Sequence, residues 1–343
     1  MRATEVREFV DSGIWAGAQL NKLPQDASFR SYWRAQKGEN SAIVMDAPPP
    51  LERVDQFVHV TELLARSGVR VPEIYQRDPD RGLLLLEDFG RATFSVLLAD
   101  GVDELALYSK ALSALNTLQN FNDDQAGRIL LPDYNFDITW TELSLFTDWY
   151  VPAVTGNLVS DHDREDFKCI WRTAFENLPE LPSVIVHRDF HVDNLMLVDD
   201  TCSLLDYQDA LIGSPAYDLV SLLEDARRDI DPDTVSTCYQ KHLADLNASA
   251  QTTRVFDLHM AFWGAQRHLK VAGIFVRLWL RDQKSVYLKH LVRVLSMARR
   301  AMQGEEFSDL RKWLDDHYIP QSHPDFHADA EEIRSILMPQ SRN

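Results

Sequence analysis

His187-Arg188-Asp189-Phe190-His191-Val192-Asp193-Asn194 is the stretch that decides how this chain folds. This motif loop comes directly after Val184-Ile185-Val186, a short β-branched run that is typical of a buried strand. The order predicts a polar loop that leaves the end of a buried strand. Asp189 and Asn194 are five residues apart on it, so both side chains can face one cleft.

A hairpin is predicted immediately after the motif loop. Leu195–Val198 and Ser203–Asp206 are expected to be its strands, and Asp199-Asp200 its turn. The returning strand should carry Asp206 back beside Asn194. A carboxylate and an amide at neighbouring strand ends are oxygen ligands of the kind that Mg²⁺ prefers, with waters and phosphates completing its shell.

The pattern H-R-D-x-x-x-x-N, followed by a downstream aspartate, predicts phosphoryl transfer from ATP. In that chemistry one carboxylate accepts the proton of the attacking hydroxyl, while an amide and a second carboxylate hold Mg²⁺ on the phosphates. Asp189 fits the first role, and Asn194 and Asp206 fit the second. Each residue could instead cap a turn, but that explanation accounts poorly for three of them at this spacing.

The composition is that of an ordinary globular chain. Its 343 residues suffice for two packed lobes, and 45% of them are hydrophobic. The net charge of −18 argues against a nucleic-acid partner, because phosphate backbones bind to basic surfaces. The longest apolar stretch, Val271–Leu280, is broken by Arg277 and is too short to span a bilayer, so no membrane association is expected.

A cytoplasmic location is expected from the amino terminus and the cysteines. Residues 1–13 are charged and lack the apolar core of a signal peptide. Cys169, Cys202 and Cys238 are widely spaced and form no C-x-x-C pair. That pattern favours reduced thiols in a cytosolic protein over a disulfide framework.

The chain changes from strand-rich to helix-rich near residue 90. Strands are predicted before that point at 28–34, 41–45, 69–75 and 83–86, together with one helix over Leu51–Arg66 that Gly68 ends. After residue 93, apolar residues recur at helical spacing. Helices are predicted over 216–228, 234–246, 255–271, 284–302 and 307–317.

Several further segments carry a resemblance to a known family. They are 26–30 (D-A-S-F-R), 45–49 (M-D-A-P-P), 204–210 (L-L-D-Y-Q-D-A), 213–219 (G-S-P-A-Y-D-L) and 266–275 (Q-R-H-L-K-V-A-G-I-F). With the motif loop, they make the chain similar to the aminoglycoside phosphotransferase-like superfamily of small-molecule kinases. Within it, the sequence resembles the bacterial anomeric N-acetylmuramate/N-acetylglucosamine kinases of peptidoglycan recycling.

The resemblance implies an α+β, bilobal protein-kinase-like fold. A small antiparallel-sheet lobe over residues 1–90 would bind nucleotide, and a larger helical lobe over 91–343 would hold the catalytic loop and the acceptor. The implied activity is an ATP- and Mg²⁺-dependent kinase that phosphorylates the anomeric hydroxyl of an amino sugar. Kinases of other small acceptors, of the aminoglycoside, choline or homoserine type, share the same catalytic set and stay open as alternatives.

The resemblance also implies roles for individual residues. Asp189 is the expected catalytic base, and Asn194 and Asp206 are the expected Mg²⁺ ligands. His187 and Asp218 are expected to support the loop rather than touch the substrate. Asp218 could equally be an ordinary acidic residue in the first turn of a helix.

Ser28, Arg30 and Glu87 are expected to contact the nucleotide. Two usual kinase features are absent from the sequence around them: there is no glycine-rich loop, and Met45 stands where kinases carry a phosphate-binding lysine. Arg30, Arg34 or another cation then has to replace that lysine. The alternative is a nucleotide-binding pseudokinase that acts as a scaffold.

The acceptor is expected to contact Asp209, Arg267 and His268. Arg267 and His268 belong to a helical segment that also carries Phe262 and Trp263, and a carbohydrate site combines polar groups with an aromatic face. A carboxylate on the acceptor would require an arginine or a lysine. This helix face could equally pair with the abundant carboxylates of the chain.

Overall fold

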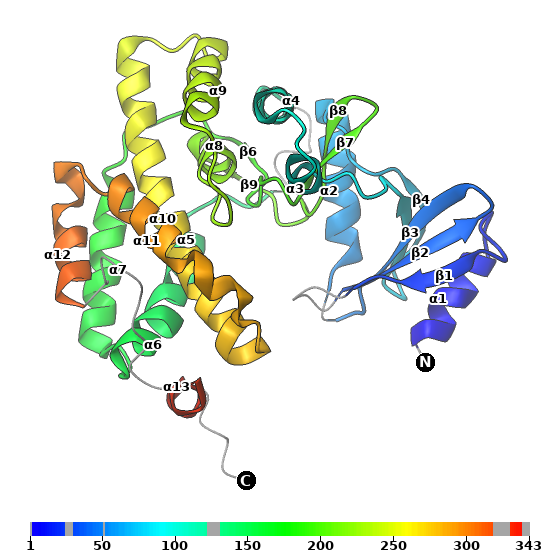
Figure 1. Cartoon of the computed structure of the whole chain (residues 1–343), viewed down its shortest axis with the longest axis horizontal. Helices are drawn as coiled ribbons and strands as arrows, with labels where there is room; N and C mark the ends of the chain where they lie inside the picture. The colour runs from blue at the N-terminus through cyan, green and yellow to red at the C-terminus, as the bar shows by residue number, and fades with distance from the viewer. Residues whose placement is uncertain (1, 25–29, 51, 122–130, 318–329, 338–343) are drawn as a thin grey trace. The chain divides into compact units, whose positions relative to one another are not determined.

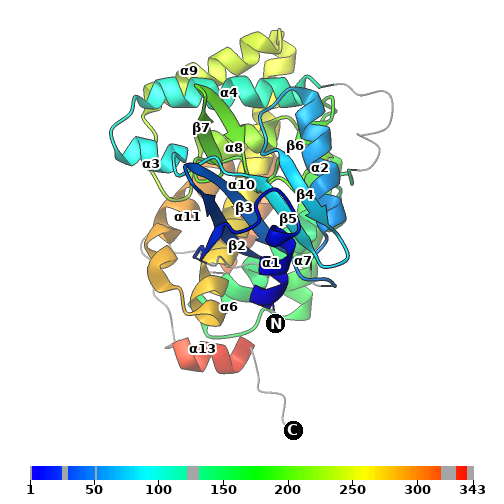
Figure 2. The ribbon, with the colours of Figure 1, turned by 90° about the vertical axis from the view of Figure 1, so that its right-hand side faces the viewer.

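The computed structural model describes residues 2–24, 30–50, 52–121, 131–317 and 330–337. The chain forms two compact units (Figures 1 and 2). The first unit comprises Met1–Leu131 and His187–Ala210, and the second comprises Pro132–Val186 and Leu211–Asn343. The first unit thus extends beyond residue 90, and the division into lobes at that residue stays a prediction.

A five-stranded antiparallel sheet forms the framework of the first unit. Its strands lie in the order β1-β2-β3-β5-β4. The tightest connection joins β2 to β3, where Lys37 pairs with Asn40 and Gly38, with a φ of 62°, begins the two-residue turn. The strands are β1 (Gln19–Lys22), β2 (Ser31–Lys37), β3 (Asn40–Asp46), β4 (Ile74–Asp78) and β5 (Leu83–Glu87).

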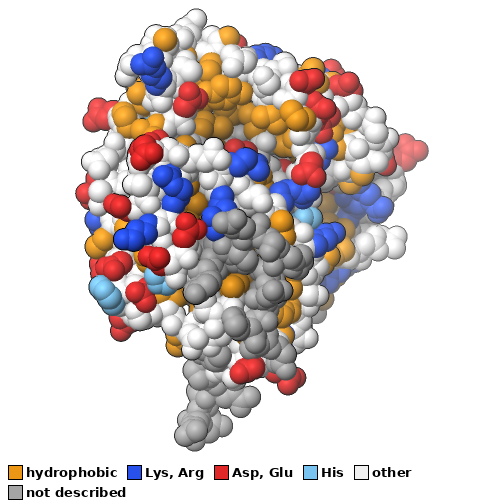
Figure 3. Space-filling model, turned by 60° about the vertical axis from the view of Figure 1, so that its left-hand side comes forward, with side chains coloured by type: hydrophobic (Ala, Val, Ile, Leu, Met, Phe, Trp, Pro, Cys, Tyr) orange, Lys and Arg blue, Asp and Glu red, His pale blue; other side chains and the backbone are white. Residues whose placement is uncertain are grey.

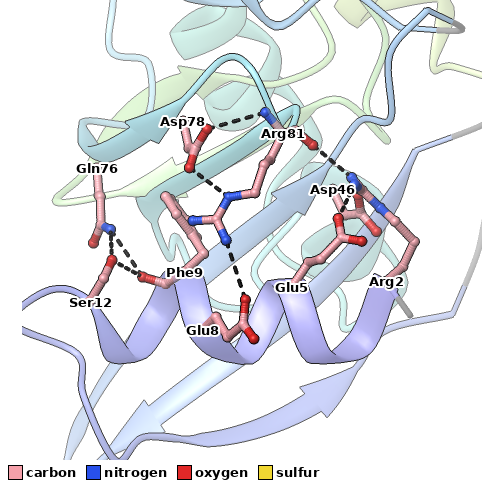
Figure 4. A network of polar contacts seen from close by, with 9 residues as sticks. All are labelled: Arg2, Glu5, Glu8, Phe9, Ser12, Asp46, Gln76, Asp78 and Arg81. Atoms are coloured by element: carbon pink, nitrogen blue, oxygen red, sulfur yellow. Dashed lines mark hydrogen bonds and ion pairs between the residues drawn. The ribbon is translucent and has the colours of Figure 1, made fainter.

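Helix α1 (Arg2–Asp11) covers one face of this sheet, and the sequence patterns did not predict it. Its buried residues Val6 and Phe9 share a core with Val44 and Leu85 of the sheet. Polar contacts fix the helix along its length, as Figure 4 shows. Among them, the Arg81 guanidinium lies 2.7 Å from Asp78 and 3.6 Å from Glu8 of α1, and Gln76 donates to the carbonyl of Phe9.

Helix α2 (Val54–Ser67) forms as predicted and ends at Gly68, which adopts the left-handed conformation with a φ of 90°. Its apolar stripe is buried, and the ring of Phe57 packs against that of Tyr207 with the centroids 5.3 Å apart and the planes tilted by 33°. The remaining helices of the first unit are α3 (Phe94–Ala99) and α4 (Glu104–Gln119).

The predicted hairpin after the motif loop forms with the expected first strand and turn, but its second strand is 201–204 rather than 203–206. Strands β7 (Leu195–Val198) and β8 (Thr201–Leu204) pair with Val198 opposite Thr201, so Asp199-Asp200 make a two-residue turn. Both aspartates have positive φ values, 48° and 61°, as a type I′ turn requires. Backbone hydrogen bonds from Leu204 to the carbonyl of Arg70 and from Leu197 to that of Ala92 fix the hairpin within the first unit.

The second unit is mainly helical, with one small strand pair. Its longest element, α10 (Ala250–Asp282), has 33 residues and packs against several other helices. Close approach to α5 depends on Gly273, where an added Cβ would lie 2.3 Å from the carbonyl oxygen of Leu145. The other elements are α5 (Phe136–Leu145), η2 (Phe146–Tyr150), α6 (Val151–Thr155), α7 (Asp161–Glu176), β6 (Val184–Val186), β9 (Leu211–Gly213), α8 (Ala216–Leu223), α9 (Pro232–Asp245), η3 (Ser285–His290), α11 (Leu291–Ala301), η4 (Glu305–Phe307), α12 (Ser308–Asp316) and α13 (Ala330–Leu337).

Three predicted helices differ clearly in extent from those of the structure. The helix expected over 216–228 ends at Leu223, and the one expected over 255–271 runs from Ala250 to Asp282. The helix expected over 284–302 is divided into η3 and α11. The long helix continues because its apolar residues stay buried past residue 271 and so supply packing energy that propensity does not measure.

The surface carries side chains of both charges. The face in Figure 3 mixes Lys and Arg side chains with carboxylates, despite the net charge of −18. Among the described residues, no helix combines the length and apolar character that crossing a membrane requires.

Candidate active site

The motif loop is held in shape by hydrogen bonds between its own residues. The backbone N–H of His191 donates to the carbonyl of Asp189 at 3.0 Å, and that of Asn194 donates to His191 at 2.8 Å. The side-chain amide of Asn194 also donates to the Asp189 carbonyl, at 3.0 Å. Arg188 adopts a φ of 83°, a conformation that non-glycine residues seldom adopt outside functional turns. The loop therefore fixes Asp189 and Asn194 relative to each other.

Asp206 lies beside these two residues, as the hairpin predicted. The backbone N–H of Leu205 donates to the Asn194 carbonyl at 2.9 Å, and Asp206 follows with a φ of 60°. The Asp206 side chain is about half exposed. Partial burial, and then the negative charge of Asp189, raise its pKa. The charge of Asp189 thus acts on Asp206, whose neighbour Leu205 is hydrogen-bonded to Asn194. Two carboxylates and an amide are side chains of the kind that a hard cation binds.

His187, which is predicted to support the motif loop, is buried in the first unit and contacts that loop. Its ring is buried, its Nδ1 accepts a hydrogen bond from the backbone of Asp189 at 3.3 Å, and it packs edge-on against Phe190. Burial lowers the pKa of His187 to about 4, so the imidazole is neutral near pH 7 and can accept that bond. Asp218 lies in the second unit, fully buried in the first turn of α8, and its support of the loop stays a prediction.

Arg30, one of the residues predicted to contact the nucleotide, lies beside Asp206 in the structure. Its Nε donates to Glu52 Oε2 at 3.0 Å, and its Nη1 lies 3.8 Å from Asp206 Oδ1. The guanidinium is 12% exposed, and Glu52, which sequence reasoning missed, is 16% exposed. Ser28, the other residue expected near the phosphates, lies outside the described residues.

The other cation and acid expected near the nucleotide have partners within the protein. Arg34 binds Asp88 through two hydrogen bonds of 2.6 and 3.0 Å. Burial alone would raise the pKa of Asp88, but the hydrogen bonds from Arg34 and others hold it below its usual value. The Glu87 carboxylate contacts Arg70 and accepts from the backbone of Glu73. A nucleotide contact by Glu87 therefore stays a prediction. Because its carboxylate is engaged, the backbone groups of Glu87 would have to make that contact.

Gln208 forms hydrogen bonds to both Asp206, a candidate metal ligand, and Asp209, a candidate contact of the acceptor. Its Nε2 donates to Asp206 Oδ1 at 3.0 Å and to Asp209 Oδ2 at 3.2 Å. Gln56 of α2 donates to the Gln208 carbonyl at 3.0 Å. Sequence reasoning missed this role, because a glutamine next to a motif carries no signal of its own. The acceptor role of Asp209 stays a prediction.

Arg267 and His268 lie on α10 in the second unit and have different surroundings. His268 is fully buried, burial lowers its pKa, and its Nε2 donates to Glu224. Arg267 is only 5% exposed, and its buried Nη1 has no hydrogen-bond partner in the described part of the chain. Its positive charge helps to lower the pKa of the nearby Glu224. His268 is thus occupied within the protein, whereas Arg267 is a buried cation that a ligand anion could neutralise.

A second buried network lies on the same helix. Lys270 Nζ lies 2.7 Å from Glu142 Oε1, and Gln266 donates to the other oxygen of Glu142 at 2.8 Å. Tyr134 donates to Glu142 as well, and Tyr217 lies 3.3 Å from Lys270 Nζ. The charges of Lys270 and Glu142 offset each other within this network. Because Glu142 belongs to α5 and Lys270 to α10, their contact holds the two helices together.

Residues 19–248 match the model of a phosphotransferase enzyme family. The chain is 39% identical over 307 residues to an N-acetylmuramate/N-acetylglucosamine kinase of Pseudomonas aeruginosa, covering 87% of this chain and 88% of the relative. It is 36% identical over 283 residues to a protein of the same name from Neisseria meningitidis, covering 80% and 83%.

Solved structures of two other enzymes have a similar fold. The ADP-bound aminoglycoside phosphotransferase APH(2'')-Ib aligns over 87% of this chain and 98% of its own, with a TM-score of 0.56 and 15% identity. The choline kinase LicA from Streptococcus pneumoniae aligns over 87% and 99%, with a TM-score of 0.61 and 12% identity. These likenesses confirm the predicted fold class.

Proposed function

The chain belongs to the phosphotransferase enzyme family, and from that membership we propose that it transfers the γ-phosphoryl group of ATP to the anomeric hydroxyl of an amino sugar. It is a phosphotransferase and a kinase. N-acetylmuramate and N-acetylglucosamine are the acceptors that we propose, because they are named for relatives that match most of the chain. The observation that carries the mechanism is the placement of Asp189, Asn194 and Asp206 within one compact unit.

In this mechanism Asp189 accepts the proton of the anomeric hydroxyl as the sugar oxygen attacks the γ-phosphorus. The bond to the β-phosphate oxygen breaks, and ADP leaves. Asn194 and Asp206 would hold Mg²⁺, which neutralises charge on the phosphates when bound. The raised pKa of Asp206 beside Asp189 fits this assignment, since a bound cation offsets the repulsion between two neighbouring carboxylates.

Arg267 is our candidate for the contact that recognises an acidic acceptor. N-acetylmuramate carries a carboxylate and N-acetylglucosamine does not, so a buried arginine whose Nη1 has no hydrogen-bond partner in the described residues would favour the former. In this proposal His268 acts indirectly, by holding Glu224. Asp209 would accept a hydrogen bond from a sugar hydroxyl.

The proposed product is a sugar 1-phosphate, the form in which a sugar can next be joined to a nucleotide. We therefore place the enzyme in the recycling of cell-wall amino sugars. A cytoplasmic location is part of the proposal, because ATP is the phosphoryl donor.

The decisive experiment is an acceptor screen with ATP and Mg²⁺. It includes N-acetylmuramate, N-acetylglucosamine, choline, homoserine and an aminoglycoside, with ³¹P and ¹H NMR to locate the new phosphate. The proposal expects an anomeric phosphate on an amino sugar. Exclusive phosphorylation of another acceptor would overturn the substrate, and no turnover with any acceptor would favour a pseudokinase.

Asp189→Asn is the matched variant for the mechanism. Loss of a positioned general base costs about 10²- to 10⁴-fold in rate, so turnover should fall by that factor. Nucleotide binding, measured by calorimetry, should persist because Asp189 is assigned to the acceptor hydroxyl. Undiminished turnover in this variant would remove Asp189 from the role of base.

A further inference from the structure

The phosphate-binding lysine that this chain lacks has a defined position on the sheet of kinases. Kinases place a lysine on the third strand, where it binds the α- and β-phosphates and pairs with a glutamate. Side chains of a strand alternate between faces. Ala42 and Val44 of β3 belong to the core under α1, so Ile43 and Met45 point to the opposite face. Met45 therefore lies on that face, and its uncharged side chain cannot form an ion pair with a phosphate.

Arg30 reaches the same region from the neighbouring strand. Tyr32 of β2 is the register partner of Met45, and Trp33 belongs to the α1 side of the sheet. Arg30 comes just before β2 begins at Ser31 and is two residues before Tyr32, so the alternation, extended by one residue, would put it on the face of Met45. The contact of 3.8 Å between Arg30 Nη1 and Asp206 Oδ1 agrees with this placement.

Glu52 fixes the guanidinium of Arg30. The contact between Arg30 Nε and Glu52 Oε2 is 3.0 Å, and both side chains are more than four-fifths covered. An exposed ion pair contributes little, but a covered one holds its geometry because water competes poorly for the charges. Arg30 also interacts with Tyr32, whose pKa is raised mainly by burial. The cation is therefore held in place before any ligand arrives.

Alternative residues for this role have other partners. Arg34, on the same face of β2, is engaged by Asp88 through two hydrogen bonds. In kinases, a glutamate pairs with the phosphate-binding lysine. Glu62 is the candidate for this glutamate on α2, but its side chain is exposed and lies 3.6 Å from Arg77 of β4. Within the described residues, Arg30 is the cation that lies within 4 Å of Asp206.

We propose that Arg30, positioned by Glu52, replaces the lysine–glutamate pair of kinases and binds the phosphates of the nucleotide beside Asp206. The planar fork of arginine suits this double task, since Nε can hold a carboxylate while Nη1 and Nη2 face the phosphates. The glutamate comes from the segment before α2 rather than from the helix itself. This inference rests on the proposed kinase function and adds its nucleotide-binding cation.

The test measures ATP and acceptor separately for Arg30→Ala, Arg30→Lys and Glu52→Gln. Arg30→Ala should raise the KM for ATP and the Kd for Mg-ADP by about 10- to 100-fold, the range for a lost charge-assisted hydrogen bond. The acceptor KM should stay within two-fold. Arg30→Lys should retain part of the affinity. Arg53→Ala is the matched control, because Arg53 adjoins Glu52 but is 71% exposed and pairs with Asp55; it should behave as wild type.

Two further measurements separate a phosphate contact from a structural role. Glu52→Gln should weaken ATP binding in the wild-type background and have no additional effect in Arg30→Ala, because it acts through Arg30. Guanidinium ion added to Arg30→Ala should restore part of the ATP affinity. An ATP KM and an Mg-ADP Kd within two-fold of wild type in Arg30→Ala would overturn the inference. Mg-ADP binding needs no acceptor, so this result is independent of the proposed substrate.

Discussion

The hydroxyl oxygens of Thr61 and Tyr207 lie 3.0 Å apart, buried between α2 and the residue that follows Asp206. The Thr61 hydroxyl donates to the Phe57 carbonyl at 2.7 Å, and the rings of Phe57 and Tyr207 pack against each other at a tilt of 33°. The helix is thereby joined to the segment that carries the candidate metal ligand. A change at this contact should therefore affect both stability and catalysis.

Tyr207→Phe is expected to lower the free energy of unfolding by about 1 kcal/mol, the usual value of one buried hydrogen bond. The ring stays in place, so the core packing is retained. Without the hydroxyl, the segment around Asp206 is held less firmly, and kcat should fall by a few-fold. Urea unfolding and steady-state kinetics measure the two effects. Tyr239→Phe is a comparison at a tyrosine whose hydroxyl bonds Asp257 in the second unit; equal kcat losses in both variants would contradict a specific link.

Acid should destabilise the protein through His187. Burial lowers its folded-state pKa to about 4 from an ordinary value of 6.5. Between these values the unfolded chain binds the proton and the folded chain does not, so stability falls as the pH falls from 6.5 toward 4. The loss is about 3 kcal/mol when complete.

The measurement is urea unfolding at pH 7.5, 6 and 5 for wild type and His187→Gln. The variant should show a shallower pH dependence, although His242, whose pKa is also about 4, keeps part of the slope. His162→Gln is the control, because that imidazole is 83% exposed. An unchanged slope in His187→Gln would mean that His187 titrates normally in the folded protein.

Removing Lys270 should strongly destabilise the second unit. Lys270→Met leaves Glu142 buried without its cation, which costs about 3–5 kcal/mol. Adding Glu142→Gln should recover most of this loss, because the neutral amide no longer needs a cation. Thermal and urea unfolding of both single variants and the double variant measure the coupling. Strictly additive losses would mean that the two side chains do not interact.

Arg267→Gln is expected to discriminate between the two proposed acceptors. The KM for N-acetylmuramate should rise by about 10- to 100-fold, since a charged hydrogen bond to the carboxylate is lost. The KM for N-acetylglucosamine, which has no carboxylate, should change little. Steady-state kinetics with both sugars provide the measurement. Parallel increases for the two sugars would place Arg267 away from the carboxylate.

The hairpin of β7 and β8 and helix α2 could be predicted because their signals are local. An Asp-Asp turn between apolar runs selects a two-residue connection, and the apolar period of α2 ends at Gly68. The hairpin in turn brought Asp206 beside Asn194. These features needed only residues that are close in sequence.

The contacts that were missed join distant segments. Glu52 and Arg30 are 22 residues apart, and α1 is held on the sheet by Arg81 from the turn between β4 and β5. No periodicity or turn preference encodes such pairs, because tertiary packing creates them. The surroundings of His268 and Arg267 could not be predicted for the same reason: neighbours on one helix differ only in what packs against them.

The pairing of β6 with β9 closes the segment that carries the motif loop into a ring. Val186 lies opposite Leu211, so the two residues that flank 187–210 are held about 5 Å apart. A tethered segment has few open conformations to lose, and the entropic cost of ordering it is correspondingly small. The positive-φ positions at Arg188 and Asp206 can thus be held in a closed loop, where a free chain of the same length would relax out of them.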